Sequence, residues 1–331
     1  MTTAVRPAGA LPDPGVRWLP ARLQSRAALL RLALASVVAN VVIVVTGGAV
    51  RLTNSGLGCP TWPRCTDDSL TPTHKLGIHG TIEFTNRTLT YVLVIIAVAT
   101  WLVAMARRQE RTPATLAVLG IPAQAVVGGI TVLTDLNPWL VGLHFLLSAA
   151  MIAVTFVLWW RLRIDPPAGP AQPAAAALAW VTAGVAAAVL VFGTIVTGAG
   201  PHAGDLDKGK VHRNGLDVSA MSQLHADAVM VLIGVTVGLL AVAYALRAAP
   251  AVRRSVGVLL GIELAQGAVG YTQYFLDVPP LLVGLHMLGA CLVWVATLAV
   301  LMTMRGRSAS THDDHVFPPR GRWHARSGPT G

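Results

Sequence analysis

The sequence predicts an all-α integral membrane protein, with eight transmembrane helices arranged as two pseudo-symmetric four-helix bundles. The first observation is composition: 54% of the 331 residues are hydrophobic and only 12% are charged. The second is a series of long uncharged runs, since a helix needs about 20 apolar residues to cross the hydrocarbon core. The third is a duplication, because residues 140–144 and 282–286 both read LVGLH.

Eight apolar runs have the length of a membrane span. Continuous runs of this kind are typical of helices, whereas the strands of membrane barrels alternate apolar and polar residues over about ten positions. The predicted spans are residues 29–49, 80–105, 113–133, 139–161, 176–199, 221–246, 252–274 and 280–304.

The duplication extends beyond LVGLH and divides the chain into two halves. QAVVGG at 124–129 precedes the first copy and QGAVGY at 266–271 precedes the second, while VTGGAVRLTNSG at 45–56 resembles VTGAGPHAG at 196–204. Polar or Pro-rich composition predicts disorder for the two terminal segments. The predicted organisation is an N-terminal arm (1–28), a first four-helix half (29–164), a linker (165–175), a second four-helix half (176–304) and a tail (305–331).

The Lys and Arg residues are distributed unevenly between the two sides of the predicted membrane. Eighteen of the 25 fall in the arm, the tail and the loops on their side, and six fall in the opposite loops. Because cytoplasmic loops carry the excess of Lys and Arg, we predict a multi-pass protein of the cytoplasmic membrane with both termini inside. The net charge of +10 is then explained without a nucleic-acid partner, which would favour a single basic patch.

Two of the three cysteines, Cys59 and Cys65, lie in one predicted outer loop within GLGCPTWPRC. The compartment permits a disulfide there and the spacing makes one plausible. Such a pair is either a structural staple for the loop or a redox-active site. Cys291 lies within the last span, where we expect a small buried residue. The other long outer loop, residues 198–219, has no cysteine.

Four histidines, His79, His144, His225 and His286, lie near the outer ends of alternate spans. A single helical histidine is usually a core residue, but several at one depth suggest ligands. Paired imidazoles from facing helices hold haem b in helical bundles, and His225 with His286 are candidates for such a pair. The chain has no CxxCH motif for covalent haem, and a zinc site would need further ligands nearby.

The second span begins with polar residues on a single helix face. His79, Glu83, Asn86 and Arg87 are spaced at i, i+4, i+7 and i+8. Ionisable groups inside a span are costly and usually face the bundle interior or a watery cavity. Glu83 and Arg87 either form an internal ion pair, or Glu83 handles protons beside a redox centre while Arg87 or Asn86 contacts a polar substrate group. Glu263 lacks comparable neighbours, and we expect it to be a structural polar contact.

At these residues the chain resembles the haem A synthase family. The resemblance covers roughly residues 29–304 and is carried by GGAVRLTNSGLGCPTWPRC, IEFTNR, QLHAD and the two LVGLH segments. It implies an enzyme that oxidises a ring methyl group of haem O to the formyl group of haem A, for assembly of a terminal oxidase. The implied partners are haem O, the farnesyltransferase that makes it, oxidase-assembly factors and membrane lipid.

The resemblance also implies roles for individual residues. His225 and His286 would ligate a haem b in the second half, while His144 would face the substrate haem in the first. Glu83 would be the essential acidic residue beside that substrate, with Asn86 and Arg87 in the same pocket. The loop cysteines, Cys59 and Cys65, match a pair found in many bacterial members.

One residue departs from the family pattern. Many members have histidine where this chain has Asn86, and an amide is a poor iron ligand compared with imidazole. The substrate haem is then held by His144 alone, which we favour, or His79 substitutes from about 10.5 Å farther along the helix. Three other functions fit parts of the pattern: a di-haem b electron carrier, a quinone-linked redox protein and a duplicated transporter.

Overall fold

The computed structural model describes residue 20 and residues 25–163, 173–205 and 211–304. The predictions for the tail (305–331), for most of the arm (1–28) and for most of the linker (165–175) lie outside these residues. Two basic residues of the second outer loop, Lys208 and Lys210, also lie outside them.

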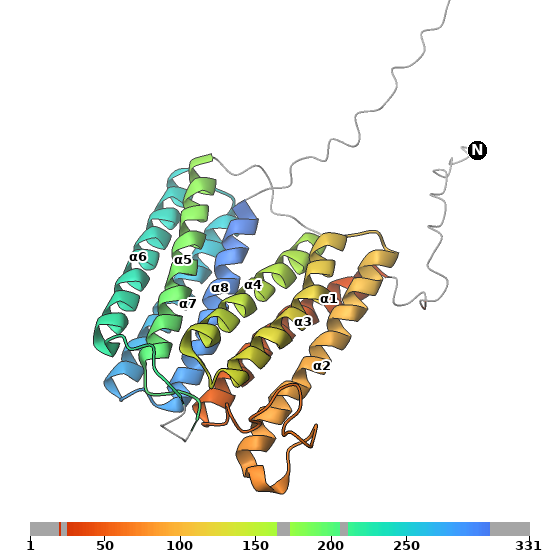
Figure 1. The fold of residues 1–331 in the computed structure, drawn as a ribbon. Helices are drawn as coiled ribbons and strands as arrows, with labels where there is room; N and C mark the ends of the chain where they lie inside the picture. The colour runs from red at the N-terminus through yellow and green to blue at the C-terminus, as the bar shows by residue number, and fades with distance from the viewer. Residues whose placement is uncertain (1–19, 21–24, 164–172, 206–210, 305–331) are drawn as a thin grey trace, which may run out of the picture.

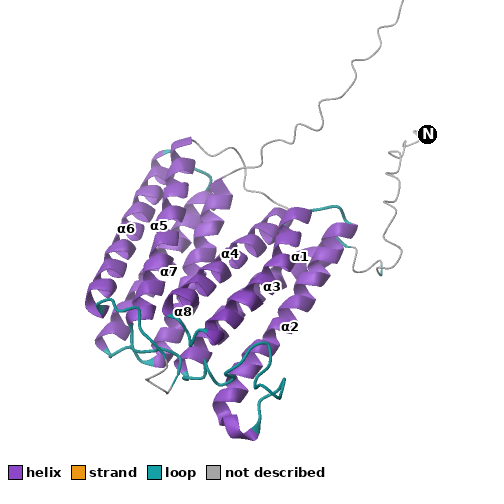
Figure 2. Ribbon diagram, in the orientation of Figure 1, coloured by secondary structure: helices purple, strands orange, loops and turns teal. Residues whose placement is uncertain are grey.

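Eight long α-helices form the described part of the chain, and each begins and ends within a few residues of a predicted span (Figure 1). No β-strand forms within the described ranges (Figure 2), where one isolated bridge joins Ser55 and Asp205. A short 3-10 helix, η1 (His74–Leu76), precedes the second long helix. The long helices are α1 (Arg26–Leu52), α2 (Gly77–Ala106), α3 (Arg111–Leu133), α4 (Pro138–Leu162), α5 (Pro173–Ala199), α6 (Val218–Ala245), α7 (Pro250–Phe275) and α8 (Pro280–Met304).

Local sequence explains where several helices begin. The Asn137 side chain accepts a hydrogen bond from the backbone N–H of Trp139 at 3.0 Å, and Pro138 occupies the first turn of α4. Asp217 caps α6 by accepting from the N–H of Ala220 at 2.7 Å. Ser25 does the same for α1 by accepting from Ala28 at 3.1 Å. Short polar caps and a proline in the first turn satisfy or remove the unpaired N–H groups there.

The helices form two four-membered rings, as the duplication predicts. Neighbours in the first ring are α1–α2, α2–α3, α3–α4 and α4–α1, and the second repeats this order with α5 to α8. The rings meet where α4 contacts α5 and α8, and where α1 contacts α8 (Figure 1). Phe156 and Leu298 pack at this junction, and so does Cys291, which is buried as predicted.

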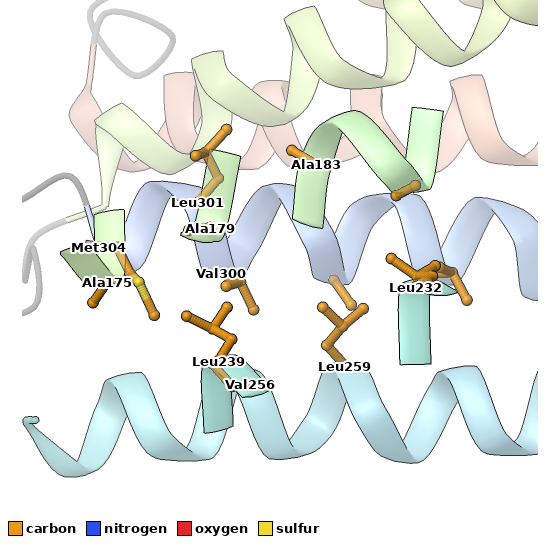
Figure 3. Packing of buried hydrophobic residues seen from close by; sticks show 13 residues of the cluster. Ala175, Ala179, Ala183, Leu232, Leu239, Val256, Leu259, Val300, Leu301 and Met304 are labelled. Carbon is orange, nitrogen blue, oxygen red and sulfur yellow. The ribbon is translucent and has the colours of Figure 1, made fainter. Parts of the chain in front are cut away.

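The second ring has the larger core. Alanines on α5 allow close approach, and Leu239, Val256, Leu259 and Val300 meet beside them (Figure 3). The same helices α6 and α8 carry His225 and His286 nearer to the residues where they begin. The core therefore fixes the helices on which those side chains lie.

Seven of the eight long helices are apolar and long enough to cross a membrane. The exception is α7, which carries Arg253, Arg254 and Glu263 together with glutamines. It still has 26 residues and packs between α6 and α8. The prediction of eight long helices is thus confirmed. Seven of them are also apolar enough to be recognised as membrane spans from their hydropathy.

Candidate functional site

The predicted site residues gather at one end of the molecule, which we call the loop end. This end carries the connections at residues 53–73, 134–137, 200–205 and 276–279 (Figure 1). His144, His225 and His286 lie about two turns inside α4, α6 and α8 from this end. Of the four histidines predicted near one level, these three share a depth, whereas His79 is only the third residue of α2.

His225 and His286 form a pair in the second ring. Their ring centroids are 6.4 Å apart and their planes meet at 75°. Both side chains are half-buried, and the Nδ1 atom of each has no hydrogen-bond partner. The carbonyl of Val189 lies near the His225 ring, but without the geometry of a hydrogen bond to Nδ1.

Glycines on neighbouring helices make room for these imidazoles. A Cβ on Gly270 of α7 would lie 3.1 Å from His286 Cε1, and a Cβ on Gly193 of α5 would lie 3.3 Å from His225 Cε1. In the first ring, Gly128 of α3 stands in the same relation to His144, at 3.2 Å. Each imidazole therefore lies against bare backbone, where a larger side chain would displace it.

A glutamine one turn before the glycine fixes the histidine backbone in both halves. Gln266 Nε2 donates to the carbonyl of His286 at 2.7 Å. Gln124 Nε2 donates to Ser148 Oγ at 2.8 Å and approaches the carbonyl of His144 at 3.5 Å. The repeated segments QAVVGG and QGAVGY were predicted only to belong to the duplication, with no role in the site. Their shared Gln–Gly spacing of four residues is the feature of the sequence that indicates this role.

The first ring does not bring a second imidazole to His144. Asn86 is half-buried, and its Oδ1 lacks a hydrogen-bond partner, as does His144 Nδ1. His79 instead hydrogen-bonds Ser55 Oγ through Nδ1 at 3.0 Å. His79 thus lies at the loop, while Asn86 Oδ1 and His144 Nδ1 are buried without a hydrogen-bond partner.

Glu83 and Arg87 form an internal ion pair, which is one of the two alternatives that their i, i+4 spacing left open. Arg87 Nη2 lies 2.5 Å from Glu83 Oε1, and Arg87 Nε donates to the same oxygen at 3.1 Å. The other oxygen, Oε2, accepts from the backbone N–H of Cys59 at 2.6 Å. Glu83 is 5% exposed, so its carboxylate is held by three N–H donors inside the protein.

The same arginine ties the cysteine loop to α2. Its Nη2 donates to the carbonyl of Cys59 at 2.9 Å, and its Nη1 donates to those of Thr61 and Arg64 at 2.9 and 3.2 Å. The predicted disulfide is present between Cys59 and Cys65. All the guanidinium nitrogens are used by Glu83 and the loop, so the side chain is directed to the loop carbonyls.

The disulfide loop packs against α3 near the first-ring histidine. A Cβ on Gly129 would lie 2.4 Å from Trp62 Cδ2, which shows that the Trp62 ring lies against α3 at this glycine. The preceding residue, Gly128, contacts the imidazole of His144. The loop that Glu83 and Arg87 hold in place therefore packs one residue away from the His144 site.

Glu263 is a buried polar contact, as predicted. It is 2% exposed, and its Oε1 accepts a hydrogen bond from Thr236 Oγ1 at 2.9 Å. Its Oε2 has no hydrogen-bond partner.

The second-ring pair has the features of a bis-histidine haem site. Imidazole–metal bonds are about 2.0–2.1 Å, so two rings on opposite sides of one ion have a centroid separation compatible with 6.4 Å. The two imidazoles are half-buried, lie against glycines and have an Nδ1 without a hydrogen-bond partner, which fits residues that would ligate a haem iron. Within the described ranges no group of three or more His, Cys, Asp or Glu could hold a metal ion, and a haem iron needs only two such ligands.

A family match and the similarity to individual proteins point to the same family. Residues 30–298 match the model of the family described as cytochrome oxidase assembly protein, COX15-CtaA. The Heme A synthase of Geobacillus kaustophilus (strain HTA426) is 31% identical over 147 residues, which are 40% of this chain and 45% of that protein. The Heme A synthase of Geobacillus thermodenitrificans is 32% identical over 134 residues, which are 38% of this chain and 41% of that protein.

The aligned segments span less than half the length of these relatives. The family match, in contrast, runs from α1 into α8 and includes every helix of both rings. The chain therefore belongs to the COX15-CtaA family of cytochrome oxidase assembly proteins.

Proposed function

We propose that this protein is a haem A synthase, which oxidises a ring methyl group of haem O to the formyl group of haem A. The observation that carries the proposal is that two otherwise similar helix rings carry different polar side chains at the loop end. The second ring has two facing imidazoles, whereas the first has the single imidazole of His144, near a disulfide loop that is anchored by a buried carboxylate. One half is suited to hold a cofactor and the other to act on a substrate.

In the second ring, His225 and His286 would hold a haem b by ligating its iron. A bound haem b supplies one-electron transfer. The protein orients the two imidazoles. Gln266 holds the His286 backbone, and the glycines at 193 and 270 leave room for the rings. The apolar core formed by α5 to α8 packs together the helices that carry the pair.

In the first ring, His144 would bind the substrate haem from one side. Asn86 would face the same pocket, where its unpaired Oδ1 accepts a hydrogen bond from a substrate group or water. Glu83 would accept a proton or position water beside the reacting methyl group. Arg87 would act through Glu83 and the loop, since its nitrogens are bound to both.

The cellular setting follows from the apolar helices and the charge distribution. We place the protein in the cytoplasmic membrane with both termini inside, because the loops on that side carry most of the Lys and Arg residues. The loop end would then face outward, where the disulfide is stable. The enzyme that supplies haem O and the factors that assemble the oxidase would be its partners.

Extraction of the haems from the purified protein tests the proposal. Cells that make haem O would express the full chain, and the haems would be separated and identified by mass. Haem A or a hydroxylated haem O beside haem B supports a synthase. Haem B alone, in two equal sites, would instead support an electron carrier, and a protein that binds no haem would contradict both.

A further inference from the structure

An arginine from the first ring reaches into the second at the loop end. Arg51 lies in the last turn of α1. Its Nη2 donates to the carbonyl of Thr197 at the end of α5 at 2.9 Å, and its Nε donates to the carbonyl of His202 at 2.6 Å. The α1 helix thus supplies a cation to the helices of the other ring.

A second arginine converges on the same segment. Arg213 Nη2 donates to the carbonyl of Pro201, the residue beside His202. The two guanidinium groups therefore bind consecutive peptide groups of one loop. That loop is itself fixed to the first ring, because Gly56 N–H donates to the carbonyl of Gly204 at 2.7 Å.

This arginine pair lies close to the imidazole pair of the second ring. Thr197 Oγ1 donates to the carbonyl of Gly193 at 2.7 Å, and Gly193 is the glycine against the His225 ring. One helical turn, about 6 Å, thus separates the Arg51 contact on α5 from the level of His225. Leu52, the neighbour of Arg51, also packs against Gly284, two residues before His286.

The arginine pair has no carboxylate partner among the described residues. The ion pairs there are Glu83–Arg87 and Glu110–Arg161, and Asp205 on the same loop makes none with Arg51 or Arg213. Carbonyl groups alone therefore face both guanidiniums. Two like charges held together without an anion are costly, and an arginine fork matches a carboxylate well.

We propose that Arg51 and Arg213 bind the propionate carboxylates of the haem held by His225 and His286. This inference rests on the haem b site of the proposed function. The macrocycle of a haem is apolar, whereas its carboxylates would be costly in the apolar core and must lie toward polar groups. Arg51 and Arg213 provide cations at the loop end, where these carboxylates would lie. The first ring thereby helps to hold the cofactor of the second.

Haem analogues with and without free carboxylates test the proposal directly. Full-length protein from haem-limited cells would be titrated in detergent with haem b and with its dimethyl ester, and the Soret absorbance would give the affinity for each. Wild type should bind haem b more tightly than the ester. Arg51→Gln should lose about tenfold or more in haem b affinity, as for one charge-assisted hydrogen bond, with little change for the ester.

Two further variants separate carboxylate binding from a loss of structure. Arg213→Gln, at an exposed position with a single carbonyl contact, should reproduce the selective loss without disturbing α1. Arg64→Gln removes an exposed arginine at the same end that bonds only the carbonyl of Asp67, and it should change neither affinity.

The outcomes distinguish this proposal from the one on which it rests. Equal affinity of wild type for haem b and the ester would overturn the propionate site but leave the haem b site standing. An equal loss for both ligands in Arg51→Gln and in Arg213→Gln would show that these arginines only join loops. Failure of wild type to bind either ligand would overturn the haem b site as well.

Discussion

Gln266 on α7 donates a hydrogen bond to the backbone carbonyl of His286 on α8, with 2.7 Å between Nε2 and the oxygen. The contact is between main chain and side chain, so it fixes the position of the helix turn that carries the imidazole. Gly270, one turn farther along α7, meets the ring itself. A single face of α7 therefore sets both the backbone and the ring of one proposed ligand.

Replacing Gln266 with Leu should weaken the haem b site while the fold persists. The volume is nearly kept, but the carbonyl of His286 loses its donor and α8 is freer to move against α7. We expect about 1 kcal/mol of lost stability and a lower ratio of haem b absorbance to protein. Gln124→Leu is the matched control, since it alters the same position in the first ring and should leave haem b bound.

Replacing Gly270 with Ala should displace the His286 ring. The new Cβ would lie 3.1 Å from Cε1, closer than an ordinary van der Waals contact. The visible spectrum and the amount of bound haem b should both change. Gly267→Ala, on the same helix, meets nothing within 4 Å and should be neutral or stabilise the helix by about 0.5–1 kcal/mol. Identical behaviour of the two variants would contradict the ring contact.

Removing the disulfide by a Cys59→Ala and Cys65→Ala double substitution should loosen the loop over the first ring. Closure of so short a loop contributes about 2 kcal/mol, and the thermal midpoint should fall accordingly. Haem b should stay bound, because Cys59 and its loop are held by residues of α2 in the first ring. Wild type treated with a thiol reductant should behave like the double variant. Unchanged stability with complete loss of conversion would instead favour a redox role.

The sequence was sufficient to predict the helices, and the reason is physical. Apolar runs of about 20 residues must form helices in a membrane, and caps such as Asn137 and Asp217 mark where they begin. α7 is instructive, because Arg253, Arg254 and Glu263 lower its hydropathy. It is a helix of full length because packing against α6 and α8, rather than hydropathy alone, stabilises it.

The site was predictable only where contacts are local in the chain. The Glu83–Arg87 pair follows from helical spacing alone, and the shared depth of the histidines follows from the repeat. The reach of Arg51 to the carbonyl of His202 and the hold of Gln266 on His286 depend on how separate elements pack. The spacing of residues along the chain does not determine how separate elements align with one another, so these contacts could be identified only from the structure.

Trp294 provides a test of how firmly the two rings are joined. Its indole Nε1 on α8 donates to the carbonyl of Ala149 on α4 at 2.9 Å. Trp294→Phe keeps an aromatic ring but removes the donor, so we expect about 1 kcal/mol of lost stability and retention of haem b. Thermal unfolding in detergent would measure the change. No loss of stability would show that apolar packing alone holds this junction.

Glu83 offers the sharpest separation of a chemical role from a structural one. Glu83→Gln keeps the size and an oxygen for the N–H of Cys59, but removes the charge that pairs with Arg87. Arg87→Gln leaves the carboxylate in place while releasing the loop carbonyls. Both variants should lose stability, by about 1–3 kcal/mol for a buried charged contact, and both should keep haem b.

Conversion of haem O to haem A should distinguish these two variants. If Glu83 moves a proton or positions water, Glu83→Gln should abolish conversion, whereas Arg87→Gln should retain part of it, because the carboxylate remains. Haem extraction from cells grown at a temperature where both variants are folded would measure the difference. If conversion instead fell in both variants only in proportion to their loss of stability, Glu83 would serve as an anchor for the disulfide loop. The acid–base role proposed for it would then be wrong.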